Sequence, residues 1–306
     1  LFTGARFAPA ALSEQEAAHL AAPAPPEADL IRADWPDWLW PPLETALGPR
    51  AQAVAAAMRG RAPFILRVNI ARIPRAGAID RLAAEGITAE PHPLAETALQ
   101  VTAGARGIAR SAAYLEGLVE LQDAASQAAV ALVPLATGDR VLDYCAGGGG
   151  KALAIAARAP RAVVSAHDAD AARMRDIGPR AARAGAKIAV LVPGAAIAAQ
   201  DLVVVDAPCS GSGTWRRTPE AKWRLTPERL AELVALQASI LDEAAAHVRP
   251  GGHLAYFTCS LFDAENVDQI QAFVARSGWS ETARRRFDPT EGGDGFFAAI
   301  VQRPTA

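Results

Sequence analysis

The second half of the chain alternates short apolar segments with amphipathic ones, and this alternation restricts the fold more than any other feature. Apolar segments of strand length occupy residues 139–143, 161–167, 187–192, 202–205 and 253–257. Between them lie segments of helical character, at residues 151–158, 170–184 and from Thr226 onward. Strands that alternate with helices build a parallel sheet covered by helices on both faces. The sequence therefore predicts an α/β fold, with a doubly wound, mostly parallel Rossmann-like sheet over residues 126–306.

The first 125 residues lack this alternation and divide into two parts. Residues 1–33 are rich in Ala and Pro and have weak periodicity, so we expect a tail or linker there. Residues 34–125 predict helices at 43–58 and 78–85, and strands at 64–70 and near 97–102. This mixture predicts a small α+β subdomain in front of the parallel sheet.

The three cysteines of the chain all fall where a predicted strand gives way to a loop. Cys145 lies in a glycine-rich turn, Cys209 follows the strand at 202–205, and Cys259 follows the strand at 253–257. Ligands of such sheets bind beyond the carboxyl ends of the strands. Small or polar residues flank Cys209 and Cys259, which favours thiol chemistry over burial as small hydrophobes. For Cys145, packing within the turn remains the favoured alternative.

The glycine turn is the expected cofactor site. It comprises Cys145, Ala146, Gly147, Gly148, Gly149, Gly150 and Lys151. Glycines after a strand let the backbone approach a ligand closely, and the next helix offers N–H groups. Ala152 stands where a phosphate-binding Walker loop needs Ser or Thr, so that motif is excluded. Asp168 follows the next strand and can accept the ribose hydroxyls of an adenosine cofactor. The turn by itself remains compatible with S-adenosylmethionine, with NAD, or with no ligand.

Two further features complete the candidate site. Asp206 precedes Cys209 by three residues, where a carboxyl group can hold a ring nitrogen and exchange a proton, or merely cap a turn. A basic stretch with interleaved tryptophans suits phosphate contact and base stacking, and a solvated surface loop is the alternative. Its candidate RNA-binding residues are Arg216, Arg217, Lys222 and Arg224.

Bulk properties narrow the setting. A net charge of −2 excludes a uniformly basic surface, so nucleic-acid contacts must come from local patches. No apolar run reaches the roughly 18 residues of a membrane span. Three cysteines without regular spacing do not form a disulfide framework. We therefore expect a cytoplasmic monomer with no metal site and no membrane partner.

Together these motifs resemble the RsmB/Sun/Fmu (NOP/Sun) family of RNA (cytosine-5)-methyltransferases. The resemblance rests on Arg67-Val68-Asn69, residues 122–127, the glycine turn, residues 206–213, Lys222-Trp223, Thr258-Cys259-Ser260, Glu265-Asn266 and residues 293–297. It implies a class I methyltransferase domain at 126–306 and an RNA-recognition role for the subdomain at 34–125.

The resemblance also implies roles for individual residues. Cys259 would be the nucleophile that adds to carbon 6 of the target cytosine, and Cys209 would promote release of the methylated product. Asp206 would hold the base at nitrogen 3 and border the cofactor. The glycine turn and Asp168 would bind S-adenosylmethionine. The implied product is 5-methylcytosine in RNA, with 16S ribosomal RNA as the expected substrate.

Departures from the family pattern keep alternatives open. Gly147-Gly148 replaces the usual Ala-Pro, and no acidic residue follows the strand at 187–192, so no residue is assigned to the adenine. The N-terminal helical RNA-binding domain of relatives is expected to be absent, or reduced to a remnant in residues 1–33. One alternative is a catalytically silent RNA-binding or ribosome-assembly factor on the same fold. The others are an NAD-dependent oxidoreductase and a DNA cytosine methyltransferase that uses Cys209 as nucleophile.

Overall fold

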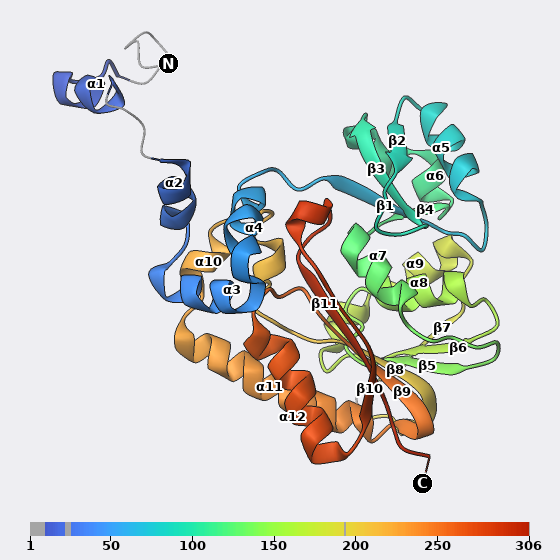
Figure 1. Ribbon diagram of the computed structural model, residues 1–306. Coiled ribbons are helices and arrows are strands. Elements are labelled where there is room, and N and C mark those ends of the chain that lie inside the picture. The colour runs from blue at the N-terminus through green and yellow to red at the C-terminus, as the bar shows by residue number, and fades with distance from the viewer. Residues whose placement is uncertain (1–9, 22–25, 193, 306) are drawn as a thin grey trace.

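The computed structural model describes residues 10–21, 26–192 and 194–305, and two sheets organise them (Figure 1). The larger sheet has seven strands in the order β10-β11-β9-β8-β5-β6-β7. Its strands are β5 (Arg140–Asp143), β6 (Val163–Ala166), β7 (Ile188–Val190), β8 (Gln200–Asp206), β9 (Val248–Thr258), β10 (Ser280–Phe287) and β11 (Phe296–Gln302). Strands β5 to β9 pair in parallel, whereas β11 is antiparallel to both of its neighbours. The predicted mostly parallel α/β sheet is therefore confirmed.

Helices cover both faces of this sheet, because successive residues of a strand point to opposite sides. Val204 and Ala255 pack in one core with residues of α7 (Ala124–Ala131) and α8 (Gly150–Arg158). Their neighbours Val203 and Leu254 pack in a second core with α11 (Pro227–Ala245) and α12 (Val267–Ser277). Figure 1 shows α11 and α12 on the side of the sheet away from α7 and α8. A further helix, α9 (Ile177–Ala184), contacts β7.

The smaller sheet belongs to the N-terminal half and has the order β2-β3-β1-β4 with antiparallel pairing throughout. Its elements are β1 (Phe64–Val68), α5 (Arg75–Ala83), β2 (Thr88–Pro91), β3 (Ala98–Ala103), α6 (Ala112–Leu115) and β4 (Val119–Leu121). Leu66, Leu82 and Leu99 are fully buried in its core. The α+β character matches the sequence-based expectation, but β2 and β4 are too short and polar for the pattern to predict.

The N-terminal region differs from its prediction in two ways. The single helix expected at 43–58 is two helices, α3 (Trp40–Leu47) and α4 (Ala51–Met58), because Gly48 has φ of 55° and Pro49 follows it. The expected tail contains the short helices α1 (Glu14–Ala21) and α2 (Glu27–Ala33). No residue of α1 is buried, whereas Ile31 of α2 joins a core. Residues 1–9 and 22–25 of the tail prediction lie outside the described residues.

That core also reaches the loops after β8 and β9. The side chains of Trp35, Trp40 and Leu43 share it with Trp215 and Phe262. The rings of Trp35 and Trp215 lie 5.5 Å apart between centroids. The N-terminal helices therefore support the loops at the carboxyl edge of the large sheet.

The end of the chain also departs from its prediction. Thr226 caps α11 as expected, because its hydroxyl accepts the Arg229 N–H at 3.2 Å. The strand expected at 253–257 begins earlier, at Val248, so Pro250 and Gly251 belong to β9. Helix α12 and strands β10 and β11 were not anticipated. In the described part of the chain, no helix has both the length and the apolar character to cross a membrane.

Candidate active site

Two thiols meet at the carboxyl edge of the large sheet. Strands β8 and β9 are parallel neighbours, with Asp206 paired to Phe257, so they end side by side. Cys259 directly follows β9, and Cys209 follows β8 after a two-residue turn. Their Sγ atoms lie 3.4 Å apart. The structure thus brings together the two cysteines that the sequence assigned to one site.

A close backbone contact holds the loop that carries Cys259. The N–H of Gly213 donates to the carbonyl of Cys259 at 2.9 Å, and the N–H of Gly295 donates to the carbonyl of Gly213 at 2.9 Å. A Cβ atom on Gly213 would lie 2.0 Å from the Gly295 carbonyl oxygen. Only glycine permits this approach, so the backbone at Gly213 and Gly295 fixes where Cys259 sits.

An ion pair borders the thiols. Lys151, in the first turn of α8, places Nζ 2.6 Å from Oδ2 of Asp206, at the end of β8. Burial by itself would lower the pKa of Lys151, but the groups around it, Asp206 foremost, together outweigh burial and raise that pKa. The ammonium group therefore stays charged and holds the Asp206 carboxylate at the site.

The glycine turn adopts the backbone shape that its sequence requires. Gly147 and Gly149 have φ of 49° and 78°, in the left-handed region that favours glycine. The N–H of Gly147 donates to Oδ2 of Asp168 at 2.9 Å. On the other side of the turn, Arg67 of β1 donates to the carbonyl of Gly150 at 2.8 Å. The first contact holds the turn against the loop after β6, and the second ties it to β1 of the smaller sheet.

Asp168 lies beside the turn, as predicted, and is almost fully buried. Besides Gly147, its carboxylate accepts the N–H of Asp170 at 3.0 Å and forms an ion pair with Arg173 at 3.3 Å. Arg173 is the exposed member of this group, with 56% of its side chain accessible. A ligand hydroxyl could therefore reach Asp168 by displacing one exposed arginine.

Burial raises the pKa of two side chains, that of Asp143 just before the glycine turn and that of Cys145 within it. It raises the pKa of Asp143 from its ordinary value near 3.8 to about 7, and the nearby Asp206 carboxylate adds to this. Burial also raises the pKa of Cys145 to about 12, again with neighbouring carboxylates contributing. Cys145 therefore keeps its proton at neutral pH, which supports the packing role left open by the sequence.

The paired thiols do not ionise independently. The hydrogen bond to Cys259 raises the pKa of Cys209, and burial raises it further. When one of two adjacent thiols is ionised, its negative charge opposes ionisation of the other. Cys209 therefore keeps its proton at neutral pH.

The four candidate RNA-binding side chains divide into two groups. Arg216 and Lys222 have only 5% and 7% of their side chains exposed, in ion pairs with Asp294 and Asp34. Their charges are neutralised inside the protein, because a buried cation requires a partner. Both side chains therefore link segments of the fold, and their contact with RNA stays a prediction.

The other two basic side chains reach solvent. Arg217 has 41% of its side chain exposed and also pairs with Asp294. Arg224 has 71% of its side chain exposed and pairs with Glu220, one turn earlier in the chain. For these two arginines, contact with RNA stays a prediction.

Sequence reasoning gave no role to Arg67, which the structure makes central. Its guanidinium is buried, and besides Gly150 it donates to Oε1 of Gln122 at 2.5 Å. Burial lowers its pKa to about 10, so it remains charged at neutral pH. Both Arg67 and Gln122 lie in segments that carried the family resemblance, but no local pattern indicated that they contact the turn.

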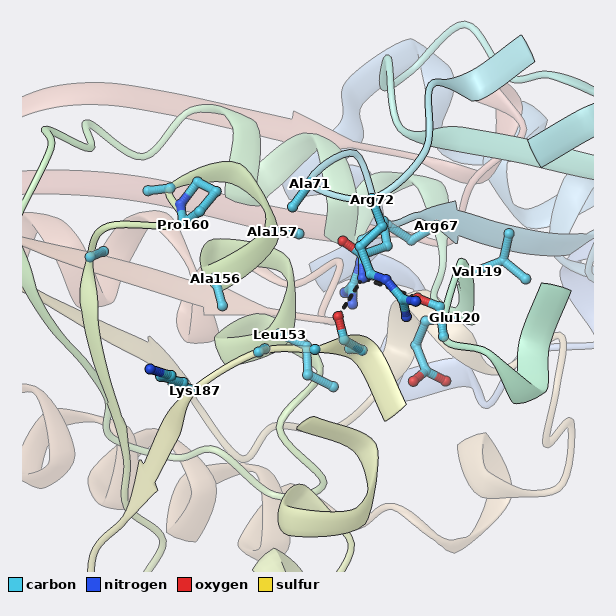
Figure 2. A pocket seen from close by; sticks show the side chains of 17 residues that line it. Arg67, Ala71, Arg72, Val119, Glu120, Leu153, Ala156, Ala157, Pro160 and Lys187 are labelled. Atoms are coloured by element: carbon cyan, nitrogen blue, oxygen red, sulfur yellow. Dashed lines mark hydrogen bonds between the residues drawn. The ribbon is translucent and has the colours of Figure 1, made fainter. Parts of the chain in front are cut away.

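A pocket of about 390 Å³ lies between the two domains and away from the thiols (Figure 2). Arg67, Arg72 and Glu120 line it from the region of the smaller sheet, and Leu153 and Lys187 line it from the region of the larger sheet. Asn69 joins the same seam by donating to the carbonyls of Gly117 and Ala184. The lining contains none of the cysteines, so this pocket belongs to the domain interface. Among the described residues, no cluster of acidic, His or Cys side chains is arranged to hold a metal ion.

The large sheet, with its glycine turn after β5, defines a Rossmann-like methyltransferase fold of class I. A solved structure of a methyltransferase homolog protein from Pyrococcus horikoshii matches with a TM-score of 0.78 and 25% identity, over 92% of this chain and 100% of that one. A family model described as 16S rRNA methyltransferase RsmB/F matches residues 129–302. A second, described as an RsmF/B-like ferredoxin-like domain, matches residues 35–106. The chain belongs to the RsmB/F family, which confirms the resemblance seen in its motifs.

Curated relatives carry the name Ribosomal RNA small subunit methyltransferase B. The protein from Salmonella arizonae is 36% identical over 86% of this chain and 65% of its own length. The protein from Xanthomonas campestris pv. campestris is 33% identical over 88% of this chain and 66% of its own length. The chain thus spans just under two thirds of the length of these relatives.

Proposed function

We propose that this protein transfers a methyl group from S-adenosylmethionine to carbon 5 of a cytosine in RNA, with 16S ribosomal RNA as the substrate. The observation that carries the proposal is the thiol pair, Cys209 and Cys259, 3.4 Å apart beside Asp206. Packing needs alone do not require two thiols at a partly exposed strand edge. The names of the curated relatives support ribosomal RNA as the substrate.

The residues around the glycine turn fit S-adenosylmethionine. The carboxylates of Asp168 and Asp206 lie close enough to Asp143 to help raise its pKa, and two carboxylates beside the turn suit a sulfonium cation. Asp168 would take the ribose hydroxyls in place of its contact with Arg173. When bound, the cofactor would supply an electrophilic methyl group.

Cys259 is the nucleophile in this proposal. Carbon 5 of cytosine reacts poorly with an electrophile until a thiolate adds to carbon 6 and shifts electron density onto carbon 5. The raised pKa of Cys209 supports this assignment, because a thiol that keeps its proton is a poor nucleophile. Addition forms the bond from Sγ of Cys259 to carbon 6 and opens the double bond between carbons 5 and 6.

Release reverses that addition. Once carbon 5 is methylated, its proton must leave, so that the double bond forms again and the Cys259 thiolate is expelled. Water takes the carbon-5 proton, and Cys209 promotes the elimination by donating its own proton to the departing sulfur of Cys259, because the two Sγ atoms lie 3.4 Å apart. Asp206, held by Lys151, would bind the base at nitrogen 3 through a proton shared between that nitrogen and the carboxylate.

The RNA must present the target cytosine outside a helical stack, because both faces of the ring are used. Single-stranded and loop RNA meets this need at the lowest cost. The ferredoxin-like domain and the exposed Arg217 and Arg224 are the proposed contacts for the flanking RNA.

The deciding experiment is transfer of labelled methyl from S-adenosylmethionine to unmodified small-subunit ribosomal RNA, with DNA of the same sequence as control. We expect label as 5-methylcytosine in the RNA alone, identified by nucleoside mass spectrometry. Label in DNA would contradict the substrate class. Absence of cofactor binding by calorimetry, with RNA binding retained, would favour the silent RNA-binding factor instead.

A further inference from the structure

A buried carboxylate lies directly behind the two thiols. Glu265 ends a short 3₁₀ helix, Asp263–Glu265, and is fully buried. A buried charge persists only when hydrogen bonds replace its lost water. The two oxygens of Glu265 accept four such bonds, from the Ser210 N–H at 2.7 Å, the Ser210 hydroxyl at 2.6 Å, the Ser260 hydroxyl at 2.5 Å and the Gln237 amide at 3.0 Å.

The donors of these bonds come from both thiol-bearing loops. Ser210 follows Cys209 and Ser260 follows Cys259, so one carboxylate binds the neighbour of each thiol. Gln237, from α11, also donates to the carbonyl of Pro208 at 2.9 Å, which fixes the residue before Cys209. The backbone on both sides of Cys209 is therefore tied, directly or through Gln237, to Glu265.

Glu265 is itself held firmly. The hydroxyl of Tyr256, in β9, donates to the Glu265 carbonyl at 2.7 Å. The next residue, Asn266, accepts from the Thr258 hydroxyl at 2.5 Å and donates to the Ser260 carbonyl at 2.9 Å. These hydrogen bonds hold the segment that carries the Glu265 carboxylate in a fixed position beside the two loops.

We propose that Glu265 is a positioning residue, which holds Cys209 and Cys259 together so that both thiols act on one cytosine. It acts through Ser210 and Ser260 and does not itself contact the base; in this respect the inference rests on the proposed function. The Glu265 charge also contributes to the raised pKa of Cys209, after the larger effects of the Cys259 contact and burial. It therefore helps to retain the proton on Cys209.

The test substitutes Glu265→Gln, which keeps the size of the side chain but replaces one acceptor oxygen with an NH₂ group. That group cannot accept the serine hydroxyls, so the charge-assisted bonds that tie the two loops to one carboxylate are lost. The matched control is Glu232→Gln, which changes an exposed carboxylate of α11 that pairs with Arg229. Should Glu265→Gln fail to fold, as judged by circular dichroism, Ser210→Ala removes one of the same bonds and replaces it.

The first readout is the distance between the thiols, independent of any activity. 4,4′-Dithiodipyridine accepts two electrons. One cysteine thiolate displaces a pyridinethiolate from the reagent, and the second thiol then loses its proton and displaces the other, forming the Cys209–Cys259 disulfide. Peptide mass spectrometry measures its rate of formation. We expect this rate to fall about 10-fold or more in Glu265→Gln, because exchange depends on access between the sulfurs, and to remain unchanged in Glu232→Gln.

The second readout separates chemistry from cofactor binding. We expect kcat for methyl transfer to fall about 100-fold in Glu265→Gln, the order expected for a displacement of about 1 Å. The Kd for S-adenosylmethionine should remain as in the unsubstituted protein, since Glu265 does not contact the glycine turn. A general loss of structure would change both quantities together.

The outcomes distinguish the two proposals. If the unsubstituted protein methylates no RNA but its disulfide rate still depends on Glu265, the proposed function fails and the positioning role stands. If it methylates RNA and Glu265→Gln matches it in both readouts, the positioning role is overturned and the proposed function stands. Failure of the unsubstituted protein to form the disulfide at all would also overturn the positioning role.

Discussion

The sulfur atoms of Cys209 and Cys259 lie 3.4 Å apart, although 50 residues separate them along the chain. The reason is the pairing of β8 with β9, which are parallel neighbours and end at the same edge of the sheet. At this distance the two thiols form a hydrogen bond with each other, and both can reach the same cytosine ring. Their individual roles can therefore be separated by single substitutions.

Substitution of Cys259 should abolish methyl transfer. Cys259→Ala removes the group that activates carbon 5, so we expect the rate to fall by about 10⁴-fold or more, the order seen when a nucleophile is deleted. Binding of S-adenosylmethionine should persist, because the glycine turn is unchanged. The measurement is labelled methyl transfer, with calorimetry for the cofactor. Activity close to that of the unsubstituted protein would refute the mechanism.

Substitution of Cys209 should have a different consequence. Cys209→Ala leaves the nucleophile but removes the group that promotes elimination, so we expect a covalent protein–RNA adduct to accumulate. Denaturing gel electrophoresis detects it as a slowly migrating band that depends on S-adenosylmethionine, and mass spectrometry should locate the bond at Cys259. The double substitution of both cysteines is the control and should give no band. An adduct on Cys209 in the unsubstituted protein would reverse the assignment and favour the mechanism of DNA cytosine methyltransferases.

The glycine turn should tolerate no side chain at Gly149. This residue has φ of 78°, and an added Cβ would lie 2.9 Å from Ile177. The backbone strain alone costs about 1–2 kcal/mol, so we expect Gly149→Ala to lower the free energy of unfolding and to weaken cofactor binding. Gly178→Ala is the control, because it lies in α9 with nothing within 4 Å of its Cβ position. It should be close to neutral, because the gain in helix propensity, up to about 1 kcal/mol, is opposed by the Pro179 that follows; equal effects of both substitutions would contradict the geometry of the turn.

Buried Asp143 should make stability depend on pH. Burial raises its pKa to about 7 in the folded protein, so the folded state prefers the protonated form. The stability from this residue is present below about 3.8 and is lost as the pH rises through about 7. Asp143→Asn cannot ionise and can still accept the Ala152 N–H. We therefore expect its free energy of unfolding, relative to the unsubstituted protein, to increase between pH 5 and pH 8.

The control for this prediction is Asp201→Asn. The backbone N–H of Arg140 lowers the pKa of the Asp201 carboxyl group, which is thus ionised in both states across the same pH range. Its effect on stability should therefore be constant from pH 5 to pH 8, as measured by urea unfolding. A constant difference for Asp143→Asn as well would show that Asp143 is not buried as a protonated acid.

Several features of the site could be read from local sequence. Asp206, Cys209 and Cys259 stood out because each follows a short apolar strand, and parallel strands end at one edge. The glycine turn was visible for a similar reason, since only glycine adopts the backbone angles found at Gly147 and Gly149. These inferences depend on the backbone preferences of single residues and on the spacing of apolar residues, and both can be read directly from the sequence.

Other features could not be read in this way. Arg216 looked like an RNA contact because it is basic and follows a tryptophan, but its partner Asp294 is 78 residues away. The role of Glu265 was equally hidden, since Ser210 approaches it across 55 residues. The prediction of one helix at 43–58 was wrong for a local reason. Gly48 and Pro49 interrupt the helix, although the apolar residues continue with helical spacing across them.

The sequence by itself therefore determined the class of fold, the edge at which the site forms and the residue types available there. Tertiary structure alone decided which charges are neutralised inside the protein, that Lys151 pairs with Asp206, and that Glu265 joins the two thiol loops. The physical reason is the separation along the chain of the residues that interact. Strand and turn preferences act between neighbours along the chain, whereas the fate of a buried charge depends on partners that only folding brings within hydrogen-bonding distance.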